Sequence, residues 1–297
     1  MAESADSCAY CVKQGAGFKR CSVCKHASYC GVACQNADWK RHKKSCVPPQ
    51  DVAAKINAAH TTGNWRGVLK WEERMEGLMA GETDDAHWCG TLSVFSNAHE
   101  LGFQVTGNHD HARSYIALQE RRIPLLGKLQ RFRDQGMAMS SIASNLFSLD
   151  RLSETENWYQ RARDVGAAHG FFSLESSACV GLGLAALNEG RPEESLNLLR
   201  NALVAAELNE LDDPQYELDA LKALIFALFQ TDSIDEVEPL VLRLREAATA
   251  QSDKGGFCSA ELVSMLESAH LHEVLCTCTP RLGTSFHGSI IASSTAA

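Results

Sequence analysis

The sequence predicts a small metal-stabilised module at the N-terminus, followed by an all-α domain built from helical repeats. Seven of the twelve cysteines lie within residues 8–46. From about residue 51 onward, apolar residues recur with helical spacing in Ala- and Leu-rich runs, with almost no strand-like alternation. Turn-forming residues recur through this second region at intervals of about 40 to 44 residues, which is typical of a helical repeat protein.

The composition is that of an ordinary globular protein. The chain has 297 residues, of which 45% are hydrophobic and 22% are charged, which excludes a mostly disordered or collagen-like protein. No apolar run is long enough to span a bilayer, and the first residues lack the apolar core of a secretory signal. We therefore expect a soluble chain of the cytoplasm or nucleus, with no membrane partner.

The net charge changes sign along the chain. Residues 1–50 carry eight Lys or Arg against three Asp or Glu, whereas the remainder carries 20 against 34. Such a change suggests two modules with different partners. The acidic body lacks the basic surface that non-specific nucleic-acid binding requires, and the basic N-terminal part could contact a phosphate or an acidic protein.

The N-terminal cysteines have the spacing of zinc ligands. The candidate ligands are Cys8, Cys11, Cys21, Cys24, Cys30, Cys34, His42 and Cys46. Eight nitrogen and sulfur ligands fill two tetrahedral Zn²⁺ sites with no open position, which predicts structural rather than catalytic zinc. So short a segment cannot fold on apolar burial alone, so the metal must supply folding energy. Redox-active cysteine pairs or a disulfide knot are disfavoured, because a thioredoxin-type motif would follow a strand in a βαβ unit.

The segment from Tyr29 to Cys46 resembles the second half of a MYND-type zinc finger, YC-x3-CQ-x3-W-x2-HK-x2-C. The two preceding C-x2-C pairs complete the resemblance over residues 8–46. It implies a cross-braced arrangement, with one zinc on Cys8, Cys11, Cys30 and Cys34 and the other on Cys21, Cys24, His42 and Cys46. Spacing alone would equally permit sequential pairing.

MYND fingers bind short proline-containing peptides in a shallow groove, and the resemblance implies that Gln35 and Trp39 line it. A tryptophan in a module with almost no core also offers a flat face for proline rings or a cation. Alternatively, Trp39 packs across its helix to stabilise the finger, and both roles can hold together. The basic run Lys40-Arg41 and Lys43-Lys44 reads as a solvated helix face, so nucleic acid is not an expected partner.

The second region reads as a helical repeat domain over residues 51–275, separated from the finger by Pro48-Pro49, which cannot continue a helix. Its recurring turn residues are Gly63, Gly107, Asp150, Gly190 and Asp232. A small or β-branched residue follows each turn five positions later, namely Val68, Ala112, Thr155, Ser195 and Val237. At these positions we expect the second helix of each pair to approach the first closely.

The fourth unit resembles a tetratricopeptide repeat (TPR), with helices longer than in the usual unit. Its matching residues are Leu182, Gly183, Ala186, Gly190, Ser195, Leu199, Ala202 and Leu203. The third and fifth units fit moderately, and the first two fit poorly because Glu72 and His99 fall where apolar residues belong. A TPR-like solenoid exposes a concave groove that suits an extended peptide or a partner helix. The alternative is a compact helical bundle without repeats.

No catalytic motif accompanies this pattern. The sequence has no G-x-S-x-G elbow, Walker A loop or dinucleotide fingerprint after a strand, so we predict no catalytic residues. MYND fingers also occur inserted in SET-domain lysine methyltransferases, but a SET domain is β-rich and residues 51–275 read as helical. The favoured interpretation is a non-enzymatic adaptor. Its alternatives are a SET-like or other enzyme with its active site in the helical body, and a nucleic-acid-associated regulator acting through the basic finger.

Two histidine groups outside the finger are alternative candidates for a metal site. His109 and His111, near His99, could gather round a metal but read more simply as surface residues. Near the C-terminus, His270, His272, Cys276 and Cys278 form a possible third site, or else belong to a capping helix with free thiols. Residues 281–297 are small and polar and are expected to be disordered.

Overall fold

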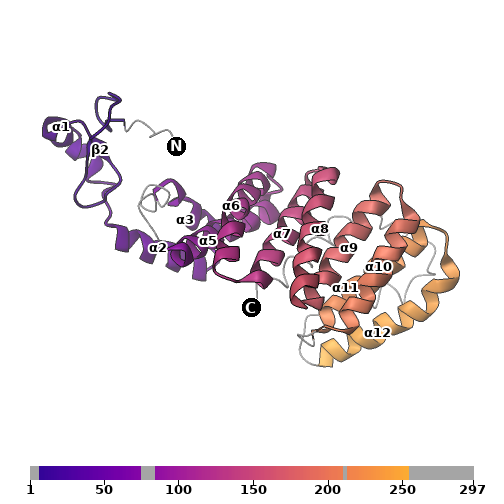
Figure 1. The fold of residues 1–297 in the computed structure, drawn as a ribbon. Coiled ribbons are helices and arrows are strands. Elements are labelled where there is room, and N and C mark those ends of the chain that lie inside the picture. The colour runs from indigo at the N-terminus through magenta and orange to yellow at the C-terminus, as the bar shows by residue number, and fades with distance from the viewer. Residues whose placement is uncertain (1–6, 75–83, 210–212, 254–297) are drawn as a thin grey trace. The chain divides into compact units, whose positions relative to one another are not determined.

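The computed structural model describes residues 7–74, 84–209 and 213–253, and Figure 1 shows their arrangement. By contact density the chain divides into two compact units, residues 1–118 and 119–297, with the division inside one helix. No helix among the described residues is long and apolar enough to cross a membrane.

The N-terminal finger contains two short strands and one helix. Strands β1 (Lys19–Arg20) and β2 (Ser28–Tyr29) pair antiparallel, with Lys19 opposite Tyr29, and helix α1 (Val32–His42) follows. The described remainder is helical and contains α2 (Pro49–Thr61), α3 (Trp65–Leu69), α5 (Asp85–Thr106), α6 (His109–Lys128), α7 (Phe132–Ser148), α8 (Leu152–His169), α9 (Phe172–Asn188), α10 (Pro192–Glu207), α11 (Pro214–Gln230), the 3₁₀ turn η1 (Ile234–Glu236) and α12 (Val237–Asp253). The predicted fold class, a small finger followed by an all-α TPR-like body, is confirmed.

Helix starts follow local chemistry. Pro49 is the first residue of α2, where its missing N–H and fixed φ fit the helix start. The carboxylate of Asp84 accepts hydrogen bonds from the backbone N–H groups of Ala86 and His87 at the start of α5, and Asp213 caps α11 in the same way. Between α1 and α2, Pro48 adopts an extended conformation, so the chain leaves the finger without continuing its helix.

All five predicted turn residues have left-handed backbone conformations. Their φ angles are 66° at Gly63, 66° at Gly107, 60° at Asp150, 74° at Gly190 and 56° at Asp232. The residues five positions later are all 2% exposed or less: Val68, Ala112, Thr155, Ser195 and Val237. The turn register read from the sequence is therefore correct in every unit, including the first two. The pairs are α2 with α3, α5 with α6, α7 with α8, α9 with α10, and α11 with α12.

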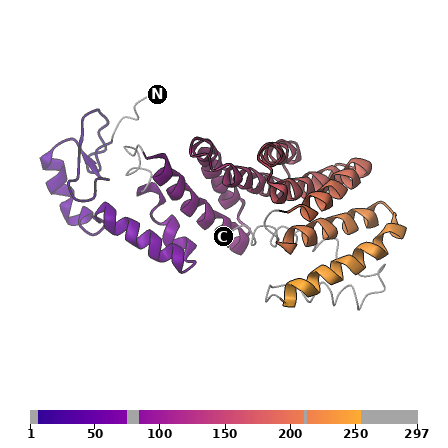
Figure 2. The ribbon, with the colours of Figure 1, turned by 60° about the horizontal axis from the view of Figure 1, so that its bottom comes forward.

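Close helix approach in the fourth unit depends on glycine. A Cβ atom at Gly183 would lie 2.6 Å from Cγ of Leu199 on α10, and one at Gly181 would lie 2.2 Å from the ring of Tyr159 on α8. Glycine at these two positions lets α9 pack against both neighbours. In both views α7, α8, α9 and α10 lie side by side as successive antiparallel helices (Figure 1, Figure 2).

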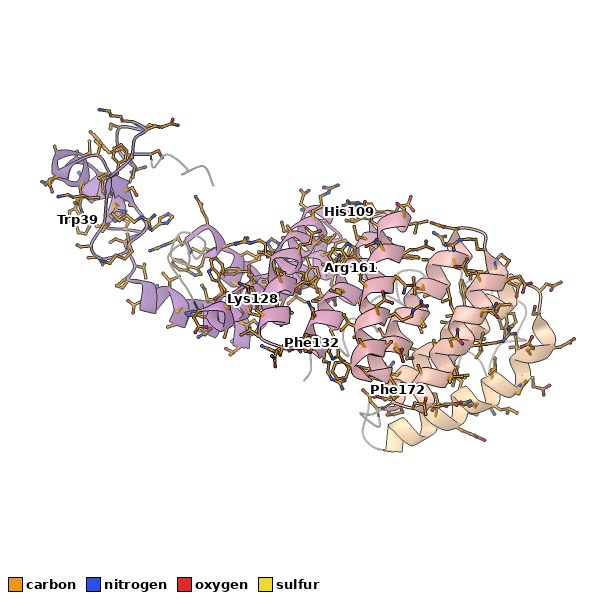
Figure 3. The ribbon with its side chains drawn as sticks, in the orientation of Figure 1. Trp39, His109, Lys128, Phe132, Arg161 and Phe172 are labelled. Carbon is orange, nitrogen blue, oxygen red and sulfur yellow. The ribbon has the colours of Figure 1, made fainter. Side chains whose placement is uncertain are left out.

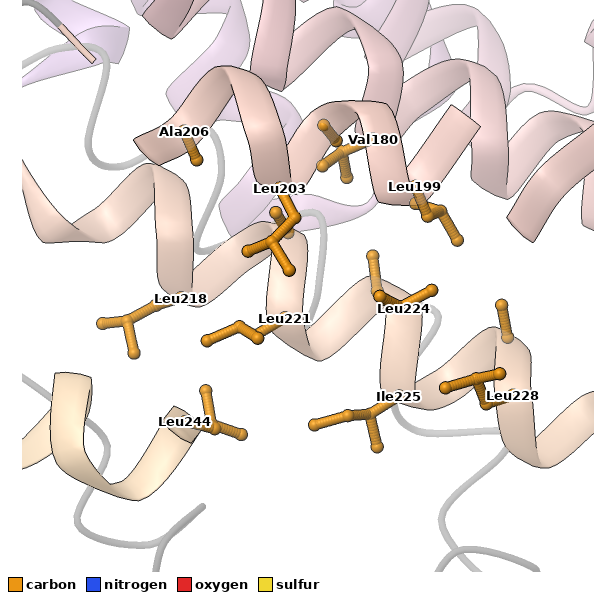
Figure 4. Packing of buried hydrophobic residues seen from close by; sticks show 14 of the residues in the cluster. Val180, Leu199, Leu203, Ala206, Leu218, Leu221, Leu224, Ile225, Leu228 and Leu244 are labelled. Carbon is orange, nitrogen blue, oxygen red and sulfur yellow. The ribbon is translucent and has the colours of Figure 1, made fainter. Parts of the chain in front are cut away.

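An extensive buried apolar cluster joins α9, α10, α11 and α12. Leu199 and Leu203 of α10 face Leu221 and Leu224 of α11, and Leu244 of α12 approaches α11 from its other side (Figure 4). Because each pair buries its apolar face against the next pair, the stability of this region comes from stacking between neighbours.

Candidate metal centres

The eight predicted ligands gather into two groups of four. In each group, one candidate ligand atom per residue lies within 4.8 Å of the others. The first group is Cys8, Cys11, Cys30 and Cys34, and the second is Cys21, Cys24, His42 and Cys46. The structure thus brings the ligands together in the cross-braced order that the resemblance implied, not in the sequential order.

The distances between ligand atoms fit tetrahedral zinc. In the first group, the Sγ atom of Cys30 lies 3.7 Å from the Sγ atom of Cys11 and 3.5 Å from the Sγ atom of Cys34. In the second group, the Sγ atoms of Cys21 and Cys46 are 3.8 Å apart, and Nε2 of His42 lies 3.5 Å from Sγ of Cys24. A zinc tetrahedron with Zn–S bonds of about 2.3 Å has edges of about 3.8 Å. The donor set is thiolate and imidazole, so both groups fit Zn²⁺, and all four positions of each are filled by the chain.

The electrostatics of the thiols also point to a cation. Hydrogen bonds from the backbone N–H groups of Cys11 and Cys30 lower the pKa of Cys8 to about 6. The pKa of Cys34 rises to about 12, chiefly through its contact with the Cys30 thiol, and burial with the neighbouring Cys21 raises that of Cys46 to about 12. Thiols this close cannot all ionise alone. Bound zinc would supply the positive charge that holds them as thiolates and links folding to metal binding.

The two C-x2-C pairs form matching turns. The N–H of Val12 donates to the carbonyl of Cys8 over 2.9 Å, and that of Lys25 donates to the carbonyl of Cys21 over 3.0 Å. Both donors have left-handed conformations, with φ of 59° at Val12 and 57° at Lys25. Left-handed backbone is strained for a β-branched side chain such as that of Val12. Each turn brings the two cysteines of its C-x2-C pair into the same ligand group.

A polar network centred on the buried carboxylate of Asp38 links α1 to the first cysteine turn. The hydroxyl of Tyr29 donates to Oδ2 of Asp38 over 2.8 Å, and Nε of Arg41 donates to Oδ1 over 2.6 Å. Nη2 of Arg41 also donates to the carbonyl of Ala9 over 2.6 Å. Asp38 was not among the residues predicted from the sequence, and Arg41, which is exposed as predicted for the basic run, also pairs with this carboxylate. The available signal was their i, i+3 spacing on the helix.

Trp39 lies on α1 with its ring partly exposed. Its side chain is on the finger in Figure 3, the residue is 45% exposed, and its ring centroid lies 5.9 Å from that of His42. Gln35, one turn earlier on α1, is partly exposed. The tryptophan therefore contacts a metal ligand with part of its ring and leaves the rest accessible. That Gln35 and Trp39 line a peptide groove stays a prediction.

The histidines outside the finger behave differently from one another. His99 and His111 lie in contact, whereas His109 instead stacks edge-on against Phe103, with ring centroids 5.9 Å apart. The three rings do not form a metal site of three or more ligands in the part of the chain that the structure describes. The candidate group His270, His272, Cys276 and Cys278 and the predicted disordered segment 281–297 lie outside the described residues.

Comparison with known proteins identifies the finger. Residues 8–46 match the family model of the MYND finger, so the N-terminal module is a MYND finger. Human N-lysine methyltransferase SMYD2 is 44% identical over 46 residues, which is 16% of this chain and 11% of that protein. SET domain-containing protein 14 of Caenorhabditis elegans is 46% identical over 90 residues, 30% of this chain and 20% of that protein. The F-box protein At1g67340 of Arabidopsis thaliana is 59% identical over 34 residues, 11% of this chain and 9% of that protein.

The chain thus spans at most about a fifth of the length of these curated relatives. The helical body has its likeness among solved structures. BtubC from P. vanneervenii gives a TM-score of 0.54 at 11% identity, covering 68% of this chain and 80% of that chain. A Podospora anserina kinesin light chain with nearly identical TPR-like repeats gives a TM-score of 0.52 at 12% identity, covering 69% of this chain and 96% of that chain. A Rap protein complexed with Competence and Sporulation Factor gives a TM-score of 0.55 at 13% identity, covering 80% of this chain and 65% of that chain. The fold of the body is that of a TPR-like solenoid.

Proposed function

We propose that this protein is a non-enzymatic adaptor. Its MYND finger binds proline-containing peptides through the face that carries Gln35 and Trp39. Its TPR-like body binds a second protein or peptide. Linking the two modules in one chain raises the effective concentration of one partner near the other.

The observation that carries the proposal is the exposed tryptophan on a helix anchored at both ends by metal ligands. Cys34 lies at the start of α1 and His42 at its end, so zinc binding fixes the backbone between them. Trp39 keeps 45% of its surface accessible in that rigid setting. A fixed aromatic face loses little conformational entropy on binding and suits the flat ring of proline.

The metal chemistry supports a structural rather than a catalytic role for the finger. Each ligand group supplies four donors from the chain, which leaves no position for a reacting water or substrate. The methyltransferases among the relatives match this chain over a small share of their own length. The described strands, β1 and β2, both belong to the finger, and this favours an adaptor over a β-rich SET-type enzyme.

The helical body supports a second binding surface by its architecture. Stacked helix pairs present an extended face instead of a single deep site, and such faces bind peptides or helices. The Rap protein of similar fold was solved in complex with Competence and Sporulation Factor. For the present chain, the excess of acidic residues after residue 50 favours a basic partner segment.

The test is peptide binding by the full zinc-loaded chain. Arrayed peptides with a central proline, and the same peptides with that proline replaced by alanine, are probed with wild type, Trp39→Ala and Val23→Ala. Val23 is a matched control because it is another exposed apolar residue of the finger, at 45% exposure. We expect binding to proline peptides that falls at least tenfold in Trp39→Ala and persists in Val23→Ala, with two zinc ions per chain throughout. Equal binding by wild type and Trp39→Ala would reject the peptide-reading role.

A further inference from the structure

The two polar residues that disrupt the repeat pattern belong to one partly buried cluster centred on His99. Nε2 of His99 lies 3.1 and 3.2 Å from the two carboxylate oxygens of Glu72, and Nδ1 of His99 lies 3.0 Å from Nδ1 of His111. The side chain of His99 is 8% exposed. The cluster joins three segments of the first compact unit, because Glu72 follows α3, His99 is on α5 and His111 is on α6.

The carboxylate of Glu72 determines which nitrogen of the His99 ring carries the hydrogen. Because Glu72 offers oxygen acceptors to Nε2 of His99, that nitrogen carries the hydrogen and donates it. In neutral His99 the other nitrogen, Nδ1, therefore holds a lone pair. It can accept a hydrogen bond only from an N–H at Nδ1 of His111.

Only one of the two Nδ1 atoms can therefore carry a hydrogen while the hydrogen bond between the rings is intact. An added proton can occupy Nε2 of His111, and the resulting imidazolium still donates from Nδ1 to His99. When both rings are protonated, two N–H groups face each other across 3.0 Å, and the hydrogen bond is lost with two positive charges in contact. The pair tolerates one positive charge and is broken by a second.

The surroundings hold the rings in place. The ring of Trp65 packs edge-on against that of His111, with centroids 5.1 Å apart. A Cβ atom at Gly102 would lie 3.0 Å from the His111 ring, so glycine there lets the ring rest on α5. Burial and the charge of His99 lower the pKa of His111, with Asp110 and Glu72 opposing and Arg66 adding to the effect.

One further titratable group lies beside the cluster on α5. Glu100 follows His99 directly and is 6% exposed, and burial raises its pKa to about 7. Its protonation on acidification favours the folded state, so its effect on stability has the opposite sign to that of the histidine pair. A comparison between variants that keep Glu100 cancels its contribution.

We propose that Glu72, His99 and His111 form an acid-sensitive latch between the first two helix pairs. Above the ordinary histidine pKa of about 6.5, the latch ties the segment after α3 to α5 and α6. Uptake of the second proton releases α6 from α5. The sign follows from the geometry of the contact: the folded pair disfavours a second proton, so the stabilisation is present above the ordinary histidine pKa and is lost as pH falls through the lower value at which the folded pair takes up that proton.

The experiment is amide hydrogen exchange of the full zinc-loaded chain at pH 7.5 and pH 5.5, corrected for the intrinsic rate, with zinc content measured at each pH. We expect protection in α5 and α6 to fall several-fold on acidification, because a single proton taken up by the unfolded state near pH 6.5 can change the folding equilibrium by at most about tenfold between these pH values. His111→Phe should abolish this pH dependence. His109→Phe is the matched control on the same helix and should retain it.

A spectroscopic measurement on the wild type covers the case in which His111→Phe does not fold. The ring ¹⁵N shifts of His99 and His111 report which nitrogens carry hydrogen at each pH. We expect one ring to resist protonation until well below pH 6.5, with the exchange protection lost at that step. Two rings that titrate independently near 6.5, or protection that is the same at both pH values, would overturn the latch. A third zinc ion per chain that is lost in His111→Phe would also overturn it, because a metal would then bridge the rings.

Discussion

The phenolic oxygen of Tyr29 lies 2.8 Å from Oδ2 of Asp38, and both residues are buried. This bond connects the residue before the ligand Cys30 to the middle of α1. The carboxylate of Asp38 also accepts from Arg41, whose guanidinium reaches the carbonyl of Ala9 in the first cysteine turn. One buried carboxylate therefore joins three parts of the finger besides the metal ions.

Asp38→Ala is expected to loosen the finger. The substitution leaves the buried Tyr29 hydroxyl without its acceptor, which costs about 1–3 kcal/mol. Zinc release to a competing chelator should therefore be at least several-fold faster than in wild type. Asp110→Ala serves as control, because Asp110 pairs with Arg113 on an exposed surface and such pairs contribute little. Identical release rates for Asp38→Ala and wild type would show that the network does not support the zinc sites.

Val12→Gly is expected to stabilise the finger. Val12 is 75% exposed and has a φ of 59°, so the substitution removes little buried surface and relieves left-handed strain of about 1 kcal/mol or more. The measurement is again chelator-driven zinc release, which should slow. Ala37→Gly, at an exposed position in the middle of α1, should instead accelerate release, because glycine weakens a helix interior. Faster release from Val12→Gly would contradict the strain argument.

Removing zinc is expected to unfold the finger and spare the helical body. The finger has a buried cluster made mostly of its own ligands, whereas α9 to α12 share an extensive apolar core. Excess chelator should release two zinc ions and leave most of the far-ultraviolet helical signal. Loss of the amide NMR signals of the finger, with those of α9 to α12 unchanged, is the expected spectrum. Collapse of the whole helical signal would show that the body depends on the metal.

Gly181→Ala is expected to destabilise the stack of α8 against α9. The new Cβ atom would lie 2.2 to 2.5 Å from three ring atoms of the buried Tyr159, and overpacking of this kind costs about 1–3 kcal/mol. Urea denaturation followed by circular dichroism measures the loss. Gly90→Ala on α5 is the matched control, since no atom lies within 4 Å of its added Cβ and alanine favours a helix. If Gly181→Ala were as stable as wild type, the Tyr159 ring would not lie against Gly181 in solution.

Glu100→Gln is expected to stabilise the protein at high pH and to leave its stability at low pH nearly unchanged. Burial raises the pKa of Glu100 from 4.5 to about 7, so the folded state favours the protonated carboxyl. The stabilisation is fully present below the unfolded pKa and is lost as pH rises through the folded value. At pH 8 the variant should exceed wild type by up to about 3 kcal/mol, and at pH 4.5 the two should be nearly equal. Urea denaturation at the two pH values checks this, and a constant difference would contradict the assignment.

Local sequence patterns were sufficient for much of the fold. Turn residues at Gly63 and Asp232 mark the turns inside the first and last helix pairs, because a left-handed residue commonly ends one helix and lets the next fold back. The spacing of cysteines around residues 8–46 predicted two closed zinc sites, because short turns and helix turns fix which side chains can reach one ion. These features depend on residues near one another in sequence.

The remaining features depend on tertiary contacts. Glu72 and His99 looked like errors in an apolar pattern, and only the packing of the segment after α3 and of α6 against α5 shows that His99 contacts both Glu72 and His111. The pairing of cysteines into two crossed groups and the anchoring of α1 through Asp38 likewise join segments separated in the chain. The sequence by itself determined the ligands, the turns and the helix register. The tertiary structure decided which polar groups meet, because the distance between side chains of separate helices is fixed by packing and not by spacing along the chain.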